Sequence, residues 1–201
     1  MADVVLPALA RINIALAGGN GLRVHGVTSR DSTDLDTYTT SWETGVYEEA
    51  SRAVIEAARS AGWNVEIVAS DNFFRSITVW QPGADKERDG VGVDIGQEYR
   101  ARDVRVVPGG GLVMDLDDIA AGKCRALHDR REANDFADAA SLLAHPGWNL
   151  ARLFDAAKAA LPNLALEEFR ELLHSVVVIS DRELDQTGVA ASFIRGVLNS
   201  A

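Results

Sequence analysis

The sequence predicts an α+β protein, a mixed sheet with flanking helices followed by an α-helical C-terminal domain. Three β-type runs lie in its first half: 63–69, 73–81 and 90–96. Beyond Leu116 the composition changes to alanine, leucine and arginine, and the residues that follow show no strand pattern except an ambiguous run at 176–179. We therefore expect an α/β domain at 1–116 and a helical domain at 117–201.

The first elements are predicted from apolar runs and their breaks. Residues 1–12 form an apolar segment with Pro7 inside, enough for one or two helical turns. Residues 12–17 are typical of a buried strand that leads into Gly18-Gly19 and a short helix from Asn20. The run at 33–37 is expected to be a strand, because β-favouring residues continue through it.

A longer helix is expected at 41–61. Thr40 can cap it, Glu43 stands three residues later as in a capping box, and Gly62 ends the apolar stripe. Gly45 in its first turns favours a start a few residues later. Residues 82–89 form a polar, hairpin-like link, and the run at 104–114, with a proline and three glycines, is a less regular fourth strand.

The second half is predicted to be helical. Pro146-Gly147 and Pro162 break it, while 176–179 is ambiguous between strand and helix. The Asp-x-Asp at Asp115–Asp117 stands where a helix starts, so we interpret it as capping. The expected helices are 118–129, 131–144, 149–160, 165–178 and 182–198.

Composition limits the class of protein. The chain is 47% hydrophobic and 25% charged, which is ordinary for a soluble globular protein. It has no apolar run near the ~20 residues of a membrane span and no signal-peptide pattern, so no membrane association and a cytoplasmic location are expected. The single cysteine, Cys124, excludes an internal disulfide, and the four histidines fall at no metal-ligand spacing.

The formal charge of −10 argues against broad, sequence-independent binding to nucleic acid. A local contact stays open, because the arginines gather in two places where they could hold phosphates. Exposed ion pairs of small energetic value are an equally good interpretation of any one of them. The two groups are Arg100, Arg102 and Arg105, and then Arg125, Arg130 and Arg131.

Asp34 and Asp36 are the best candidates for a metal site. Side chains two apart on a strand project from one face, about 6 to 7 Å apart along the chain. A hard cation such as Mg²⁺, completed by nucleotide phosphates, is the usual occupant of such a pair. The alternatives are a helix cap or a solvated pair, but no helix start follows directly. Gly18 and Gly19 would let backbone N–H groups approach a triphosphate, or they form only a turn.

Four further residues could complete a site. Asp94 is a lone carboxylate in an apolar strand; beside Asp34 and Asp36 it could help hold two metal ions, or it faces water on an edge strand. Lys123 lies among small and apolar neighbours on a helix and could reach nucleotide phosphates. Asp135 and Asp138, three apart on the next helix, could orient Lys123 or the arginines or be solvated.

Together these motifs resemble the AbiEii/MenT nucleotidyltransferase toxins over roughly residues 13–145. The resemblance is carried by Gly18-Gly19, the run Arg30–Asp36, the isolated Val93-Asp94-Ile95 and the helical run Lys123–Leu127, which leads to Arg130 and Asn134–Asp138. It implies a polymerase-β-like minimal nucleotidyltransferase domain, Mg²⁺ dependence and neutralisation by a cognate antitoxin. The MenT members add nucleotides to the 3′ end of tRNA and so block aminoacylation.

Residue by residue, the resemblance makes Asp34 and Asp36 the metal-binding pair and Ser32 the hydroxyl residue two positions before them. It makes Lys123 the nucleotide-phosphate lysine and Asp138 the aspartate of the last motif, and it places Arg30 in the nucleotide-binding segment. The chain departs from the family pattern in its short N-terminus, at Asn20-Gly21 and at Thr37.

The expected function is a Mg²⁺-dependent nucleotidyltransferase that transfers NMP from an NTP to an RNA 3′ end, that of tRNA by the resemblance to the MenT toxins, as the toxin of a toxin–antitoxin pair. Asp34, Asp36 and Asp94 would bind two Mg²⁺ ions, and Gly18, Gly19, Ser32 and Lys123 would hold the triphosphate. Two alternatives stay open: transfer to a protein or small-molecule hydroxyl, which the charge of −10 favours slightly, and a degenerate nucleotide-binding module.

Overall fold

A computed structural model describes residues 1–201 and divides them into two compact units. We name them the sheet unit, residues 1–21 and 32–115, and the helical unit, residues 22–31 and 116–201. The predicted α+β class is confirmed, since one mixed sheet and a set of helices make up the chain. Residues 22–31 group with the helices, although they precede most of the sheet in sequence.

The sheet has seven strands in the order β3-β4-β5-β2-β1-β7-β6. The pairs β2–β5 and β1–β7 are parallel, and the remaining neighbours are antiparallel. The strand bounds are β1 Ala15–Leu16, β2 Leu35–Thr39, β3 Asn64–Ser70, β4 Arg75–Trp80, β5 Val91–Gln97, β6 Arg105–Val106 and β7 Leu112–Val113.

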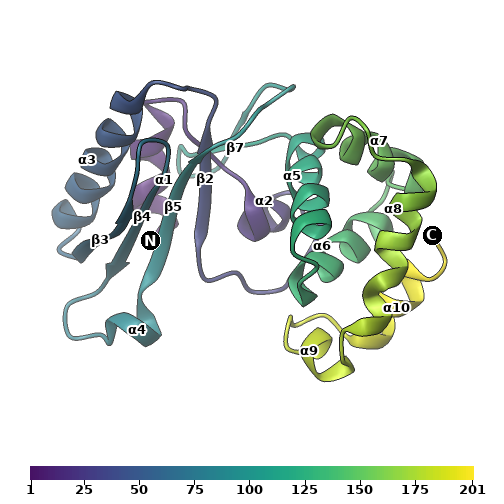
Figure 1. The fold of residues 1–201 in the computed structure, drawn as a ribbon. Helices are drawn as coiled ribbons and strands as arrows, with labels where there is room; N and C mark the ends of the chain where they lie inside the picture. The colour runs from purple at the N-terminus through teal and green to yellow at the C-terminus, as the bar shows by residue number, and fades with distance from the viewer. The chain divides into compact units, whose positions relative to one another are not determined.

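Two helices cover one face of this sheet. α1 (Ala2–Ala10) and α3 (Thr44–Ser60) lie side by side, as Figure 1 shows, and pack against strands of the sheet. Along β2, Leu35, Thr37 and Thr39 are buried, whereas Asp36 and Tyr38 are only half-buried. Alternation along the strand therefore separates a buried core face from a face that carries the carboxylates.

The start of α3 differs from the expected cap at Thr40. The helix begins at Thr44 with Glu43 as its N-cap residue, which makes no side-chain capping bond. The hydroxyl of Ser41 instead accepts a hydrogen bond from the Glu43 N–H (3.1 Å). The predicted end is confirmed: Ala61 is the C-cap residue, and Gly62 follows with a φ of +76°.

Several predicted boundaries in the sheet unit move. The strand expected at 33–37 is β2, which starts two residues later at Leu35. The run at 104–114 is two short strands, β6 and β7, joined through Gly109 and Gly110, which both have positive φ. The polar link at 82–89 contains a short helix, α4 (Lys86–Asp89), capped by the Asp85 side chain.

The helical unit consists of short helices, and α2 (Gly18–Val24) runs into its first segment. The ambiguous run at 176–179 is mostly a 3₁₀ turn, η1. The prediction of a single helix at 182–198 is wrong: the segment forms two helices, and Gly188, with a φ of +81°, lies between them. The bounds are α5 Leu116–Asp129, α6 Ala133–Ala144, α7 Leu150–Ala160, α8 Leu166–His174, η1 Ser175–Val178, α9 Asp181–Asp185 and α10 Ala191–Leu198. None of these helices, nor those of the sheet unit, is long and apolar enough to cross a bilayer.

Candidate functional site

Three carboxylates share one face of the sheet. Asp36 in β2 is the register partner of Asp94 in β5, and neighbouring strands lie about 4.8 Å apart. Asp34, just before β2, accepts a hydrogen bond at Oδ1 from the N–H of Gly92, two residues before Asp94 (3.1 Å). A Cβ at Gly92 would lie 2.7 Å from the same oxygen, so the Asp34 carboxylate lies over that glycine. We call Asp34, Asp36 and Asp94 the acidic face.

Position 18 requires a glycine because of its backbone conformation and because it lies close to the acidic face. Its φ of +57° is unfavourable for residues with a side chain. A Cβ at this position would lie 1.8 Å from Oδ2 of Asp36, much nearer than two atoms can approach. The backbone at Gly18 therefore contacts the Asp36 carboxylate directly, and Gly19 follows it in the first turn of α2.

Asn20 links α2 to the segment before β2. Its side-chain amide donates to the carbonyl oxygens of Asp34 (2.7 Å) and Ser32 (3.1 Å). Sequence reasoning treated Asn20-Gly21 as a departure from the family pattern and missed this positioning role. An amide that can donate twice, directly after the glycine pair, was the available signal.

The acidic face suits a hard cation, although it is not a complete cage. No three His, Cys, Asp or Glu side chains converge closely enough to hold a metal ion by themselves. Mg²⁺ commonly uses one or two carboxylates and completes its shell with waters and substrate phosphates. Asp36 and Asp94, side by side on parallel strands, are a carboxylate pair that could supply part of such an all-oxygen shell.

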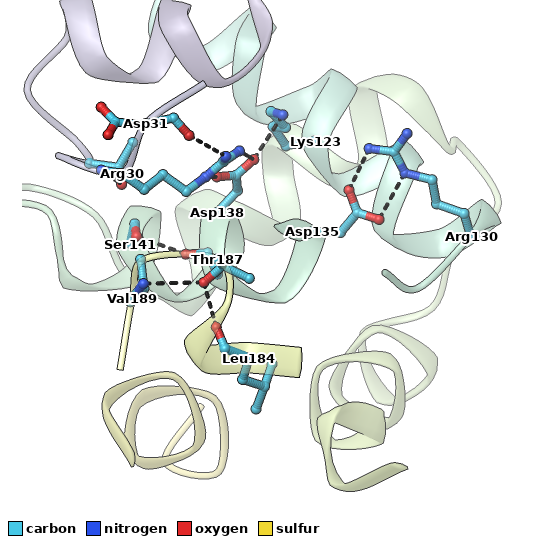
Figure 2. Close-up of polar contacts among 12 residues, drawn as sticks. Arg30, Asp31, Lys123, Arg130, Asp135, Asp138, Ser141, Leu184, Thr187 and Val189 are labelled. Atoms are coloured by element: carbon cyan, nitrogen blue, oxygen red, sulfur yellow. Dashed lines mark hydrogen bonds and ion pairs between the residues drawn. The ribbon is translucent and has the colours of Figure 1, made fainter. Parts of the chain in front are cut away.

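The helical unit holds a second charge cluster, shown in Figure 2, which we call the Asp138 cluster. The fully buried Asp138 carboxylate accepts two hydrogen bonds from the Arg30 guanidinium, at 2.8 and 2.9 Å. Lys123 Nζ lies 2.8 Å from Oδ2 of the same carboxylate, and its side chain is 13% exposed. One buried anion is therefore matched by two cations, a tight and charge-assisted arrangement.

The sequence did not decide whether Asp135 and Asp138 orient Lys123 or the arginines or are solvated. The structure gives the two residues different roles. Asp135 is the N3 residue of a capping box at the start of α6 and also accepts two hydrogen bonds from the Arg130 guanidinium (Figure 2). Only Asp138 contacts Lys123. Asp135 is thus explained by local structure, and Arg130, one of the clustered arginines, is engaged in an ion pair.

The predicted site residues fall into two groups. The sheet unit holds Gly18, Gly19, Ser32, Asp34, Asp36 and Asp94, and the helical unit holds Arg30, Lys123 and Asp138. Within the first group the structure brings the three carboxylates and Gly18 together. Within the second it joins all three residues, including the Arg30–Asp138 pair, which no sequence spacing indicated because 108 positions separate them.

Solved structures share this fold at low sequence identity. MenT4, a nucleotidyltransferase toxin from Mycobacterium tuberculosis, aligns with a TM-score of 0.65 at 17% identity, over 99% of this chain and 82% of its own. JHP933 from Helicobacter pylori aligns with a TM-score of 0.55 at 20% identity, over 98% of this chain and 90% of its own. The fold is therefore one that is also found in a nucleotidyltransferase toxin, here with an acidic face on its sheet.

Sequence comparison identifies the family within that class. The family described as "Nucleotidyl transferase AbiEii toxin, Type IV TA system" matches residues 4–191, nearly the whole chain. The chain belongs to this family, so it is a nucleotidyltransferase of the toxin type, and the resemblance predicted from the motifs is confirmed. Comparison with curated proteins gave no match.

Proposed function

We propose that this protein is a Mg²⁺-dependent nucleotidyltransferase that transfers NMP from an NTP to the 3′ end of an RNA, specifically tRNA. The observation that carries the proposal is the acidic face, where Asp36 and Asp94 are register partners and Asp34 lies on the same side. The family matched supplies the reaction class and implies an antitoxin partner. The acceptor is supported by the resemblance to the MenT toxins.

In the proposed reaction the 3′ hydroxyl oxygen of the acceptor attacks the α-phosphorus of the NTP. A new P–O bond forms, the bond to the bridging α–β oxygen breaks, and pyrophosphate leaves with that electron pair. A carboxylate of the acidic face accepts the hydroxyl proton. Asp34, Asp36 and Asp94 would hold two Mg²⁺ ions, which when bound neutralise charge on the triphosphate. The remaining contribution of the protein is positioning.

The other predicted residues have proposed roles that their surroundings support. Gly18 brings the backbone, without a side chain in the way, to the edge of the acidic face, and Gly19 follows it in α2. Ser32 lies in the segment that Asn20 fixes. Lys123 is proposed to hold the triphosphate; Asp138 contacts its ammonium group, and Arg30 in turn holds the Asp138 carboxylate.

The experiment is an incubation of purified protein with total tRNA, Mg²⁺ and each labelled NTP in turn. We expect label at the RNA 3′ end with at least one NTP and a loss of roughly 10³-fold in Asp36→Asn, because electrostatic stabilisation of the transferred group is lost. Asp3→Asn is the matched control, because Asp3 is an exposed residue on α1, which packs on the other face. If tRNA stays unlabelled and the label appears on a protein or small-molecule hydroxyl, the RNA acceptor is wrong and that alternative replaces it.

A further inference from the structure

A pocket of about 590 Å³ lies in the sheet unit where β2 and β5 end. Aromatic rings and side-chain amides dominate its lining, which includes Tyr38, Trp42, Asn72, Phe73 and Gln97. No lysine or arginine lines it. A site without cations is poorly suited to a phosphate, whereas rings and amides suit a flat heterocycle with polar edges.

This pocket continues the acidic face along the same two strands. Tyr38 follows Asp36 by two residues and Gly96 follows Asp94 by two, so all four residues lie on one face of the sheet. Tyr38 and Gly96 lie about 6.6 Å further along the strands than the two aspartates. Tyr38 and Gly96 are register partners, and a Cβ at Gly96 would lie only 3.0 Å from the Tyr38 ring. The ring therefore lies across the glycine and forms a flat floor beside the carboxylates.

The outer wall is an exposed indole held by aromatic contacts. Trp42 is 67% exposed, and its ring meets Phe73 edge to face with centroids 5.5 Å apart. Phe73 in turn contacts Tyr47, which is fully buried, at 6.1 Å. A row of three rings thus runs from the core of the unit to the surface, and it ends in a large apolar ring that is left open to a ligand.

Hydrogen bonds fix both loops that carry these rings. Asp71 Oδ1 accepts from the Phe73 N–H at 2.7 Å, and the Arg75 guanidinium beneath the loop donates to the carbonyls of Asp71 and Phe74. On the other side the Ser41 hydroxyl accepts from the Glu43 N–H and so closes the turn around Trp42. Because the exposed ring is preorganised, a ligand that stacks on it loses little entropy to loop ordering.

We propose that this pocket binds a nucleobase, stacked against Trp42, with the Asn72 and Gln97 amides facing its polar edge. The proposal rests on the proposed nucleotidyl transfer, since the sugar and phosphate of that nucleotide would extend along β2 and β5 to the acidic face. Two sources share this chemistry: the base of the incoming NTP and the terminal base of the acceptor RNA.

Two binding measurements without turnover distinguish the sources. In one, an RNA with 2-aminopurine at its 3′ end is titrated without NTP; in the other, 2-aminopurine riboside triphosphate is titrated without RNA. Stacking on an indole quenches the fluorescence of 2-aminopurine, so we expect the wild-type protein to quench the probe in one of the two titrations. In that titration alone, Trp42→Ala should lose the quenching and its Kd should rise about tenfold. Trp42→Phe, which keeps a ring, should restore part of the quenching.

Phe193→Ala is the matched control, because Phe193 is an exposed aromatic residue of α10 in the helical unit. Equal quenching and Kd in wild type and in a folded Trp42→Ala, in both arms, would overturn the proposal. The proposal would also be overturned if Trp42→Ala weakened only the binding of a protein partner such as the antitoxin. If the wild type transfers no nucleotide but still quenches a probe through Trp42, the proposed function fails and the nucleobase pocket stands.

Discussion

The acidic face and the Asp138 cluster both concentrate charge, but in opposite ways. On the sheet, three carboxylates share one face and are exposed or half-buried. Among the helices, a single carboxylate is fully buried, and Arg30 and Lys123 contact it from two sides. The first arrangement groups three carboxylates, and the second pairs a single carboxylate with two cations.

This difference fits the ligand site proposed on the sheet and a fold-stabilising role among the helices. Like charges placed together weaken the folded state unless a cation is supplied from outside, so the acidic face would gain stability from the proposed binding of metal and nucleotide. A buried ion pair is strongly destabilising when one partner is removed, because the other charge stays buried. The same type of substitution should therefore affect stability differently in the two regions.

The largest effect is expected for Asp138→Asn, compared with Asp36→Asn. Asp138→Asn leaves two cations in a buried place without their anion and should lower the free energy of unfolding by about 3–5 kcal/mol. Asp36→Asn removes one of several like charges and should leave stability unchanged or raise it slightly. Urea unfolding followed by circular dichroism measures both. Equal losses in the two variants would break the comparison.

Gly18→Ala tests how closely the backbone must approach the acidic face. The new Cβ would displace the Asp36 carboxylate, and we expect the transfer rate to fall about 100-fold, in the range found when one electrostatic group is lost. The control is Gly62→Ala, in the same unit, because Gly62 also has a positive φ but a Cβ there meets nothing within 4 Å. A similar loss in both would assign the effect to backbone strain.

Lys123→Met asks whether the Asp138 cluster also serves nucleotide binding. Arg30 still compensates Asp138 in this variant, so the change in unfolding free energy should be small beside that of Asp138→Asn. If Lys123 holds the triphosphate, the Kd for NTP should rise about tenfold, the loss of one charge-assisted contact. Calorimetric titration with a non-hydrolysable NTP measures it. An unchanged Kd would leave Lys123 with a structural role alone.

The smallest effect concerns Cys124, the residue after Lys123 on α5. Burial raises the pKa of its thiol to about 12, from an ordinary value of 9.0. The native protein should therefore resist iodoacetamide at pH 8.5, where the unfolded chain reacts readily. The unfolded thiol loses its proton near pH 9 and the native one near 12, so this group's contribution to stability is present below pH 9 and is lost as pH rises toward 12. Rapid native alkylation would show that the α5 region opens locally.

Local patterns predicted the strands well, because periodicity and glycine breaks act over a few residues. They missed two element boundaries that local details decide. Ser41 and Glu43, not Thr40, set the start of α3 through a short-range hydrogen bond, and the helix expected at 182–198 is interrupted at Gly188, where φ is positive. Asn20 was overlooked for a different reason, since its partners are backbone carbonyls 12 and 14 residues away.

The sequence by itself determined the class of fold, the family and the candidate carboxylates, because residue types and spacings carry that information along the chain. Only the tertiary structure decided that Asp94 stands beside Asp36, that Gly18 touches their face and that Arg30 joins Asp138 across 108 positions. Strand register and burial are properties of packed elements. A pair of charges becomes a site or a structural bridge only when packing sets its neighbours and its exposure to water.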